Sequence, residues 1–262
     1  MINKAFRQLF ELYSSRAVLW QLVRQHLILR YRRTALGYLW TLINPLMMMT
    51  VTAVVFSTLF KADLKTYAVF LFAGMIPWNC FSGIVTQSGA AFINNESLIK
   101  KIYLPKLIFP LSVALGVLID SCLSFVALFL IIFAIGGHLT WALLSIPFAY
   151  ILLFVFALGI ALFISIATVF FRDLQHIILI AMQAWFFLTP IMYKNDALMG
   201  KVAWLVSFNP VVPFVDMFRA PLTQGVLPNS TTVMICMALA AGSLFLGFVF
   251  FLLKEKKIIF RL

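Results

Sequence analysis

The chain alternates between long apolar runs and short polar or basic segments, and this pattern predicts helices that cross a membrane. Six apolar runs stand out, at residues 36–60, 67–92, 107–135, 141–171, 177–192 and 233–253. A helix rises about 1.5 Å per residue, so about 20 apolar residues cross a hydrocarbon core of roughly 30 Å. We therefore expect an all-α integral membrane protein, with six transmembrane helices in a single transmembrane domain over residues 1–262.

Two further segments are too polar or too interrupted to cross. Residues 1–33 are polar and apolar by turns, and Trp20, Val23 and Leu27 recur at the spacing of one helical face. This predicts an N-terminal amphipathic helix in the headgroup plane on the cytoplasmic side, either as an anchor alone or also touching a cytoplasmic partner. Residues 194–232 hold short apolar pieces punctuated by prolines, which favours an external re-entrant segment before the last span.

The basic residues give the direction of the spans. Fifteen of the 20 lysines and arginines fall on one side of the expected topology and five on the other, so the richer side, with both termini, is expected to be cytoplasmic. The formal net charge of +12 would suit nucleic acid. Because these cations cluster in short segments between apolar runs, we expect membrane lipid as their partner and no nucleic acid.

A short basic loop lies between the second and third runs. Asn95 and Glu96 suit the start of a helix, and Pro105 would end it. Three apolar side chains share one face of that helix and two lysines lie off it: Leu98, Ile99 and Ile102, with Lys100 and Lys101. This loop is either an ordinary connection or a docking helix that fits a groove on another protein.

Candidate chemistry is sparse. The three histidines lie far apart, and no paired acids, nucleophile motif or phosphate-binding loop occurs, so we predict no catalytic residue and no metal site. The three cysteines fall in apolar runs and are expected to be buried. Asp120 is the one clear intramembrane acid, with either a hydrogen bond between spans or a transport role. A transporter with so few intramembrane charges needs an outside energy source, and a separate ATPase docked on the cytoplasmic helices is the simplest.

Several short motifs together resemble a known family. In chain order they are Arg30-Tyr31 with Arg33, Leu36–Trp40, Pro45, Leu71–Gly74, Pro77-Trp78, Asn94–Lys101, Tyr103–Lys106, Phe171–Leu174, Thr189-Pro190, Asn209-Pro210 and Phe218-Arg219. The chain resembles the transmembrane subunits of type-2 ABC exporters, specifically the permeases that export O-antigen, capsule and teichoic-acid polymers. The match spans nearly the whole chain in the right order.

The resemblance implies a transport subunit of the bacterial inner membrane that moves lipid-linked polysaccharide of the O-antigen type. Two copies would pair as a homodimer above two copies of an ABC ATPase, which would bind ATP and Mg; this chain would hold no cofactor. The amphipathic helix and the loop helix would contact the ATPase. The alternatives are an exporter of teichoic acid, lipid or drug on the same fold, or a membrane enzyme acting on lipid-linked sugars.

The resemblance also implies that the first and fifth spans line the path. Aromatic rings stack on sugars, and these spans carry Tyr38, Trp40, Trp185, Phe186, Phe187 and Tyr193. The same rings could instead face lipid or pack between spans. Arg30, Arg32 and Arg33, followed by Leu36 and Gly37, either hold a lipid diphosphate or anchor the chain at the interface.

Overall fold

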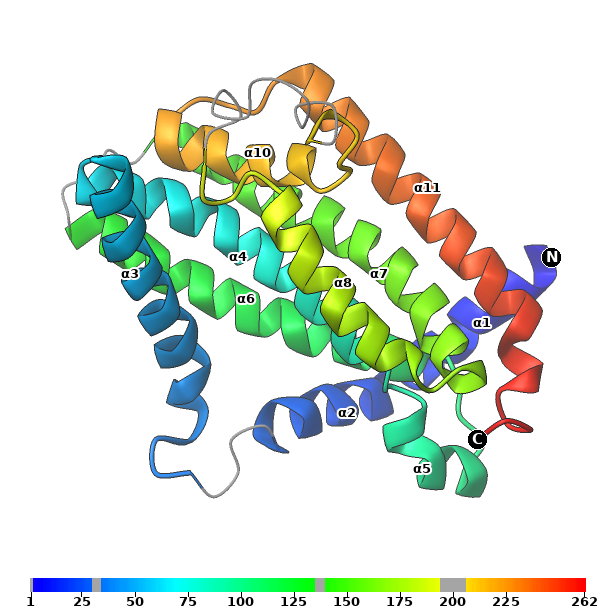
Figure 1. The fold of residues 1–262 in the computed structure, drawn as a ribbon. Coiled ribbons are helices and arrows are strands. Elements are labelled where there is room, and N and C mark those ends of the chain that lie inside the picture. Colours follow the sequence, from blue (N-terminus) through cyan, green and yellow to red (C-terminus); the bar gives the residue numbers. More distant parts are fainter. Residues whose placement is uncertain (1, 30–33, 135–139, 194–205) are drawn as a thin grey trace.

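The computed structural model describes residues 2–29, 34–134, 140–193 and 206–262. Within these ranges the chain is helical, with turns and no strand, and the prediction of an all-α membrane protein is confirmed. The long helices cross one another as a bundle (Figure 1). They are α3 (Trp40–Phe60), α4 (Leu64–Ser88), α6 (Ile108–Ala134), α7 (Ile146–Phe170) and α11 (Ser230–Lys254).

The number of helices that can cross differs from the six predicted. Among the described residues, five helices are long and apolar enough. The predicted span at 177–192 corresponds to α8 (Leu174–Leu188), which has 15 residues and is about 22 Å long. Helix α8 ends early because Pro190 pushes the preceding residue, Thr189, out of the helical conformation into an extended one.

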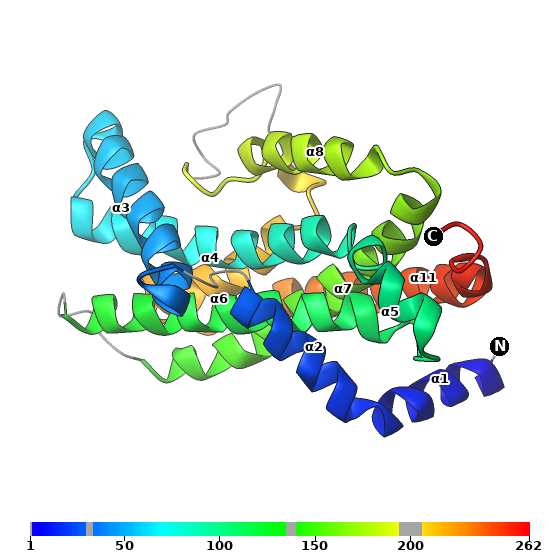
Figure 2. The same cartoon turned by 90° about the horizontal axis from the view of Figure 1, so that it is seen from below.

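Burial is uneven across the bundle. In the most apolar window of α4, 67% of the residues are buried inside the protein, and α7 reaches 56%, whereas α3 reaches only 17%. Helix α4 therefore forms the centre, and Figure 2 shows it between α8 and α6. Helix α3 is held along one side only, against α4 and α6, and presents most of its apolar surface outward.

Helices α7 and α11 pack along a seam of small residues. A Cβ atom added to Gly247 would lie 2.0 Å from the carbonyl oxygen of Gly159, so neither position tolerates a larger residue without separating the helices. The Ser243 hydroxyl also donates a hydrogen bond to the carbonyl oxygen of Phe156, at 2.8 Å. Small residues allow this close approach, and α7 and α11 form the most extensive helix pair of the fold.

The N-terminal segment forms two helices, α1 (Ile2–Ser14) and α2 (Arg16–Leu29), and α2 crosses α6 (Figure 2). Leu22 and Val23 are buried, whereas Trp20 is 62% exposed. The prediction that Trp20 lies on the same contact face as Val23 is therefore wrong. Because α2 rests on protein, its contact face is turned toward Leu22.

The shorter elements lie at the two ends of the bundle. Helix α5 (Glu96–Lys101) is near both described chain ends, and α10 (Val212–Arg219) lies at the opposite end (Figure 1). The remaining turns are η1 (Gly37–Leu39), η2 (Ile93–Asn95), η3 (Trp141–Ser145), η5 (Ala220–Gln224) and η6 (Glu255–Lys257). Of the predicted re-entrant segment 194–232, residues 194–205 lie outside the described part. Helix α10, with eight residues, is too short to cross.

Candidate functional site

A groove of about 480 Å³ opens at the end of the bundle that carries α5 and both described chain ends, hereafter the basic end. Helix α1 forms one wall, the segment after α5 the second, and the start of η6 the third. Ile102, Tyr103 and Ile259 supply apolar surface, while Arg7 and Lys256 supply positive charge. Because Glu11 and Glu255 also line it, the groove offers apolar contacts and side chains of both charges to a partner at this end.

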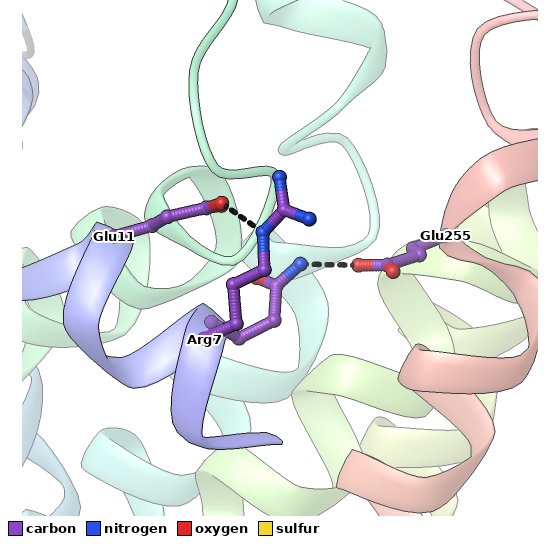
Figure 3. Close-up of polar contacts among 4 residues, drawn as sticks. Arg7, Glu11 and Glu255 are labelled. Atoms are coloured by element: carbon purple, nitrogen blue, oxygen red, sulfur yellow. Dashed lines mark hydrogen bonds and ion pairs between the residues drawn. The ribbon is translucent and has the colours of Figure 1, made fainter. Parts of the chain in front are cut away.

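The walls of the groove are joined by polar contacts between distant parts of the chain. The Gln8 amide donates to the Glu255 carboxylate at 2.7 Å, which ties α1 to the end of α11 (Figure 3). Lys106 Nζ donates to the Glu255 carbonyl oxygen at 2.6 Å. Arg7 pairs with Glu11 within α1 at 2.7 Å (Figure 3), and this hydrogen bond raises the pKa of Arg7. The groove is therefore braced from three elements.

Helix α5 carries the residues predicted to dock a partner. Its Lys100 pairs with Glu96 one turn earlier at 2.5 Å, and this hydrogen bond and the positive charge lower the pKa of the Glu96 carboxyl. Lys101 points to solvent. Asn95 lies at the N-cap position, but its side chain makes no capping hydrogen bond; its amide donates to the Ala91 carbonyl oxygen at 2.8 Å.

The three apolar side chains of this segment do not share a face. Ile99 is buried with Phe92 and Phe109 in the core beneath α5, and Leu98 is half-buried. Ile102 is 54% exposed because α5 ends at Lys101 and Ile102 has an extended backbone, so helical spacing no longer applies to it. Next to it, Tyr103 is 83% exposed. The surface available to a partner is thus Ile102 with Tyr103.

The structure describes only two of the five residues predicted to hold a lipid diphosphate or lie at the interface. Arg30, Arg32 and Arg33 lie outside the described residues. Leu36 is 44% exposed just before η1, and Gly37 begins η1 with a φ of 51°, a left-handed conformation that favours glycine. The turn brings the chain from α2 into α3.

The structure separates the predicted path aromatics into groups. Trp40 is half-buried at the start of α3, and Tyr38 lies in η1; the side chain of Tyr38 lies outside the described part. Trp185 and Phe186 turn inward against Trp78 of α4, with ring centroids 6.4 and 5.7 Å from it.

The last two path aromatics lie at the end of α8. Phe187 is 69% exposed, and the Tyr193 hydroxyl donates to the Phe187 carbonyl oxygen at 2.9 Å. Of the four aromatics around the end of α8, Phe187 presents its ring most openly.

A hydrogen-bonded clasp joins the end of α8 to the segment before α10, and reasoning from residue patterns missed it. Asn209 is its centre: its side-chain oxygen accepts from the Trp185 indole at 3.0 Å, and its amide donates to the Thr189 hydroxyl at 2.9 Å. Arg219 Nη2 donates to the Ile191 carbonyl oxygen at 2.7 Å. A polar residue beside a proline in an apolar context is the one sequence signal for it.

The Arg219 side chain also stacks on an aromatic ring. Its guanidinium carbon lies 4.0 Å from the ring centroid of Phe70 on α4. The side chain fits over Gly74, where an added Cβ would lie 2.9 Å from Arg219 Nη2. Arg219 thus connects α10, α4 and the chain after α8.

A second cavity of about 340 Å³ lies between α3, α4 and α6. Asp120 lines it and is 8% exposed, and its neighbours Ser121 and Ser124 are also buried there. Ser121 makes a hydrogen bond with Tyr150 of α7 at 3.1 Å. Among the cysteines, Cys80 and Cys236 are buried as expected, but Cys122 is exposed on α6.

Comparison with known proteins identifies the family of the chain. The family model described as ABC-2 type transporter matches residues 17–223. The O-antigen export system permease protein RfbA of Myxococcus xanthus is 31% identical over 238 residues, 90% of each chain. RfbA of Klebsiella pneumoniae is 30% identical over 208 residues, 79% of this chain and 80% of that protein. The polysialic acid transport protein KpsM of Escherichia coli is 22% identical over 234 residues, 87% of this chain and 89% of that protein.

Proposed function

Because the chain belongs to the ABC-2 type transporter family, we propose that it forms the membrane path through which an ATP-driven exporter moves a polysaccharide. Its apolar helices make it a multi-pass membrane protein. The observation that carries the proposal is the 31% identity, over 90% of both chains, to an O-antigen export permease. Family membership implies an ABC ATPase as the partner that supplies the energy, so the chain is a transport subunit.

The substrate proposed is a lipid-linked polysaccharide of the O-antigen type in the bacterial inner membrane. Two of the similar proteins are named for O-antigen export and one for polysialic acid transport. The exposed ring of Phe187 at the end of α8 offers a stacking surface that does not demand one particular sugar. These features support a polymer of sugars as the exported molecule.

We assign the ATPase to the basic end, on the cytoplasmic side with both termini. The groove there combines apolar surface at Ile102 and Tyr103 with the cations Arg7 and Lys256. The excess of lysine and arginine in the segments at this end supports the cytoplasmic assignment. A moving ATPase would press on α1, α5 and the end of α11 together, because Gln8 and Lys106 both hold Glu255.

We further propose that two copies pair along α3 and α8. Both helices expose apolar side chains, including Met47, Val51 and Leu59 on α3 and Ile177 and Ile180 on α8. Exposure in a single chain allows contact with lipid as well as with a second copy. A shared path between two α3–α8 faces would leave α4 and α7 as fixed support, in agreement with their deep burial.

The experiment is deletion of the gene in a polymer-producing cell, followed by complementation with the wild-type chain. We expect surface polysaccharide to disappear on deletion, to accumulate inside the cell, and to return on complementation. Complementation should fail when the partner ATPase carries an inactivating change in its nucleotide site. Unchanged surface polymer in the deletion strain, or recovery with the inactive ATPase, would overturn the proposal.

A further inference from the structure

The cavity between α3, α4 and α6 is polar although it lies among membrane-spanning helices. Its walls carry carboxylate, amide and hydroxyl groups from all three: Thr41, Asn44, Asn79, Gln87, Asp120, Ser121 and Ser124. On α3 and α4 these residues lie in the half of each helix nearer the basic end, which is the cytoplasmic half under the orientation proposed above. A polar wall at membrane depth is costly unless it faces protein, water or a polar ligand.

The amides at the cavity have unused hydrogen-bonding capacity. Asn44 and Asn79 are exposed, and Gln87 is half-buried. In the described part of the chain, no protein group makes a hydrogen bond with the side chain of any of these three. By contrast, the deeper Ser124 hydroxyl donates to the Asp120 carbonyl oxygen at 3.0 Å. The Ser124 hydroxyl, deep in the cavity, is therefore satisfied by the protein, while the three amides are available to bind a ligand.

The chemistry of the wall selects the ligand class. Asp120 is acidic, and among the described residues that line the cavity there is no lysine or arginine, so this part of the wall offers a diphosphate or other anion no cationic partner. Each amide carries both donors and an acceptor, which matches sugar hydroxyls, since those donate and accept as well. The volume of about 340 Å³ falls at the small end of the range for ligand pockets, about 300–1,000 Å³.

We propose that this cavity binds neutral sugar hydroxyls of the exported polysaccharide, with Asn44 and Asn79 as the contacts at its mouth. The site rests on the proposed function, because it requires that a polysaccharide be the cargo. Helix α3 is the least buried span, so sugar can reach the cavity without displacing the core of the bundle. Lipid phosphate would be held elsewhere.

The direct test is photo-cross-linking in intact exporter, in cells that make the polymer. A photoreactive phenylalanine analogue replaces Met48, which lines the cavity and is 62% exposed, or Phe245 on α11, which is 68% exposed and lies outside both the cavity and the α3–α8 face. We expect adducts that react with polymer-specific antibody at position 48, at least fivefold above position 245. Equal adducts at both positions, or adducts at position 48 with only phospholipid or a second copy of the chain, would overturn the proposal.

The second test measures transport by inverted vesicles that contain the exporter with its ATPase. The double variant N44L/N79L should raise the substrate concentration for half-maximal export about tenfold and leave the maximal rate within about twofold. The matched control is T52L on α3, whose exposed hydroxyl bonds its own helix at Met48 and lies outside the cavity; it should behave as wild type. Unchanged concentration dependence in the double variant would refute the site. Failure of polysaccharide export by the wild-type chain would instead refute the proposed function.

Discussion

The indole N–H of Trp185 donates a hydrogen bond to the side-chain oxygen of Asn209, at 3.0 Å. Trp185 lies near the end of α8, and Asn209 precedes α10, so one side chain joins two elements that meet at the end opposite α5. The same Asn209 oxygen accepts the Val211 backbone N–H at 3.0 Å. Because Asn209 satisfies several buried groups at once, the position of the end of α8 depends on it.

Replacing Asn209 by alanine should therefore destabilise the protein strongly. Each buried donor left without a partner costs about 1–3 kcal/mol, and the Trp185 and Val211 N–H groups both lose theirs. We expect a clear fall in the midpoint of thermal denaturation in detergent. The matched control is Asn229→Ala, since Asn229 is exposed and accepts one bond at 3.3 Å. Equal effects of the two changes would show that the clasp carries no special stability.

The seam between α7 and α11 predicts opposite outcomes for two glycines of one helix. Gly247→Ala should destabilise by about 1–3 kcal/mol through overpacking, because its new Cβ meets the Gly159 backbone at 2.0 Å. Gly242→Ala meets nothing within 4 Å and should be neutral or stabilising by up to about 1 kcal/mol, since alanine favours helix. Thermal denaturation of both variants measures the difference. A tolerant Gly247 would mean that the two helices can separate freely.

Docking on the basic end should depend on Ile102 and Tyr103. A double variant I102D/Y103A should insert normally yet lower export and recovery of the ATPase with the purified permease by at least fivefold, because both side chains are exposed. Ile99→Asp should instead reduce the amount of folded protein, since Ile99 is buried in the core. Immunoblots of membranes measure the amount of inserted permease and so distinguish loss of docking from loss of folded protein. Full ATPase recovery with the double variant would place the partner elsewhere.

Helix α5 should respond to acid through Glu96. Lys100 lowers the pKa of Glu96 in the folded chain, so the carboxylate stabilises α5 above the ordinary glutamate pKa of about 4.3. That contribution is lost as the pH falls through the lowered value. Hydrogen exchange of α5 amides, corrected for intrinsic rates, should be constant from pH 7 to about 5 and faster below about 4. Glu96→Gln should remove this acid response, and a variant that keeps it would exclude Glu96 as its source.

The spans could be predicted from sequence because lipid is the solvent for the apolar runs, and about 20 consecutive apolar residues leave few alternatives. The short length of this run was predicted, but the end of α8 at Leu188 was not, because Thr189-Pro190 ends the helix inside an otherwise apolar run. Similarly, Ile102 fits the spacing of Ile99 only if α5 continues, and α5 ends at Lys101. Local breaks of this kind depend on backbone conformation more than on hydrophobicity.

The inward and outward faces of the spans were the harder part. Both the inward and the outward face of α8 carry apolar side chains near its end, so periodicity does not tell that Trp185 packs against Trp78 while Phe187 is exposed. The clasp at Asn209 and the wall of amides at Asn44 and Asn79 each join residues from separate elements. Such contacts follow from the packing of whole helices, which the order of residues alone does not define.

The bond between Gln8 and Glu255 spans 247 positions of the chain, and this has a consequence during synthesis. Helix α1 leaves the ribosome well before α11, and its carboxylate acceptor, Glu255, is made only after that helix. A product truncated before Glu255 would lack the third wall of the groove and would present an incomplete docking site to the ATPase. Pairing segments so far apart in the chain would make completion of the groove wait for the synthesis of α11.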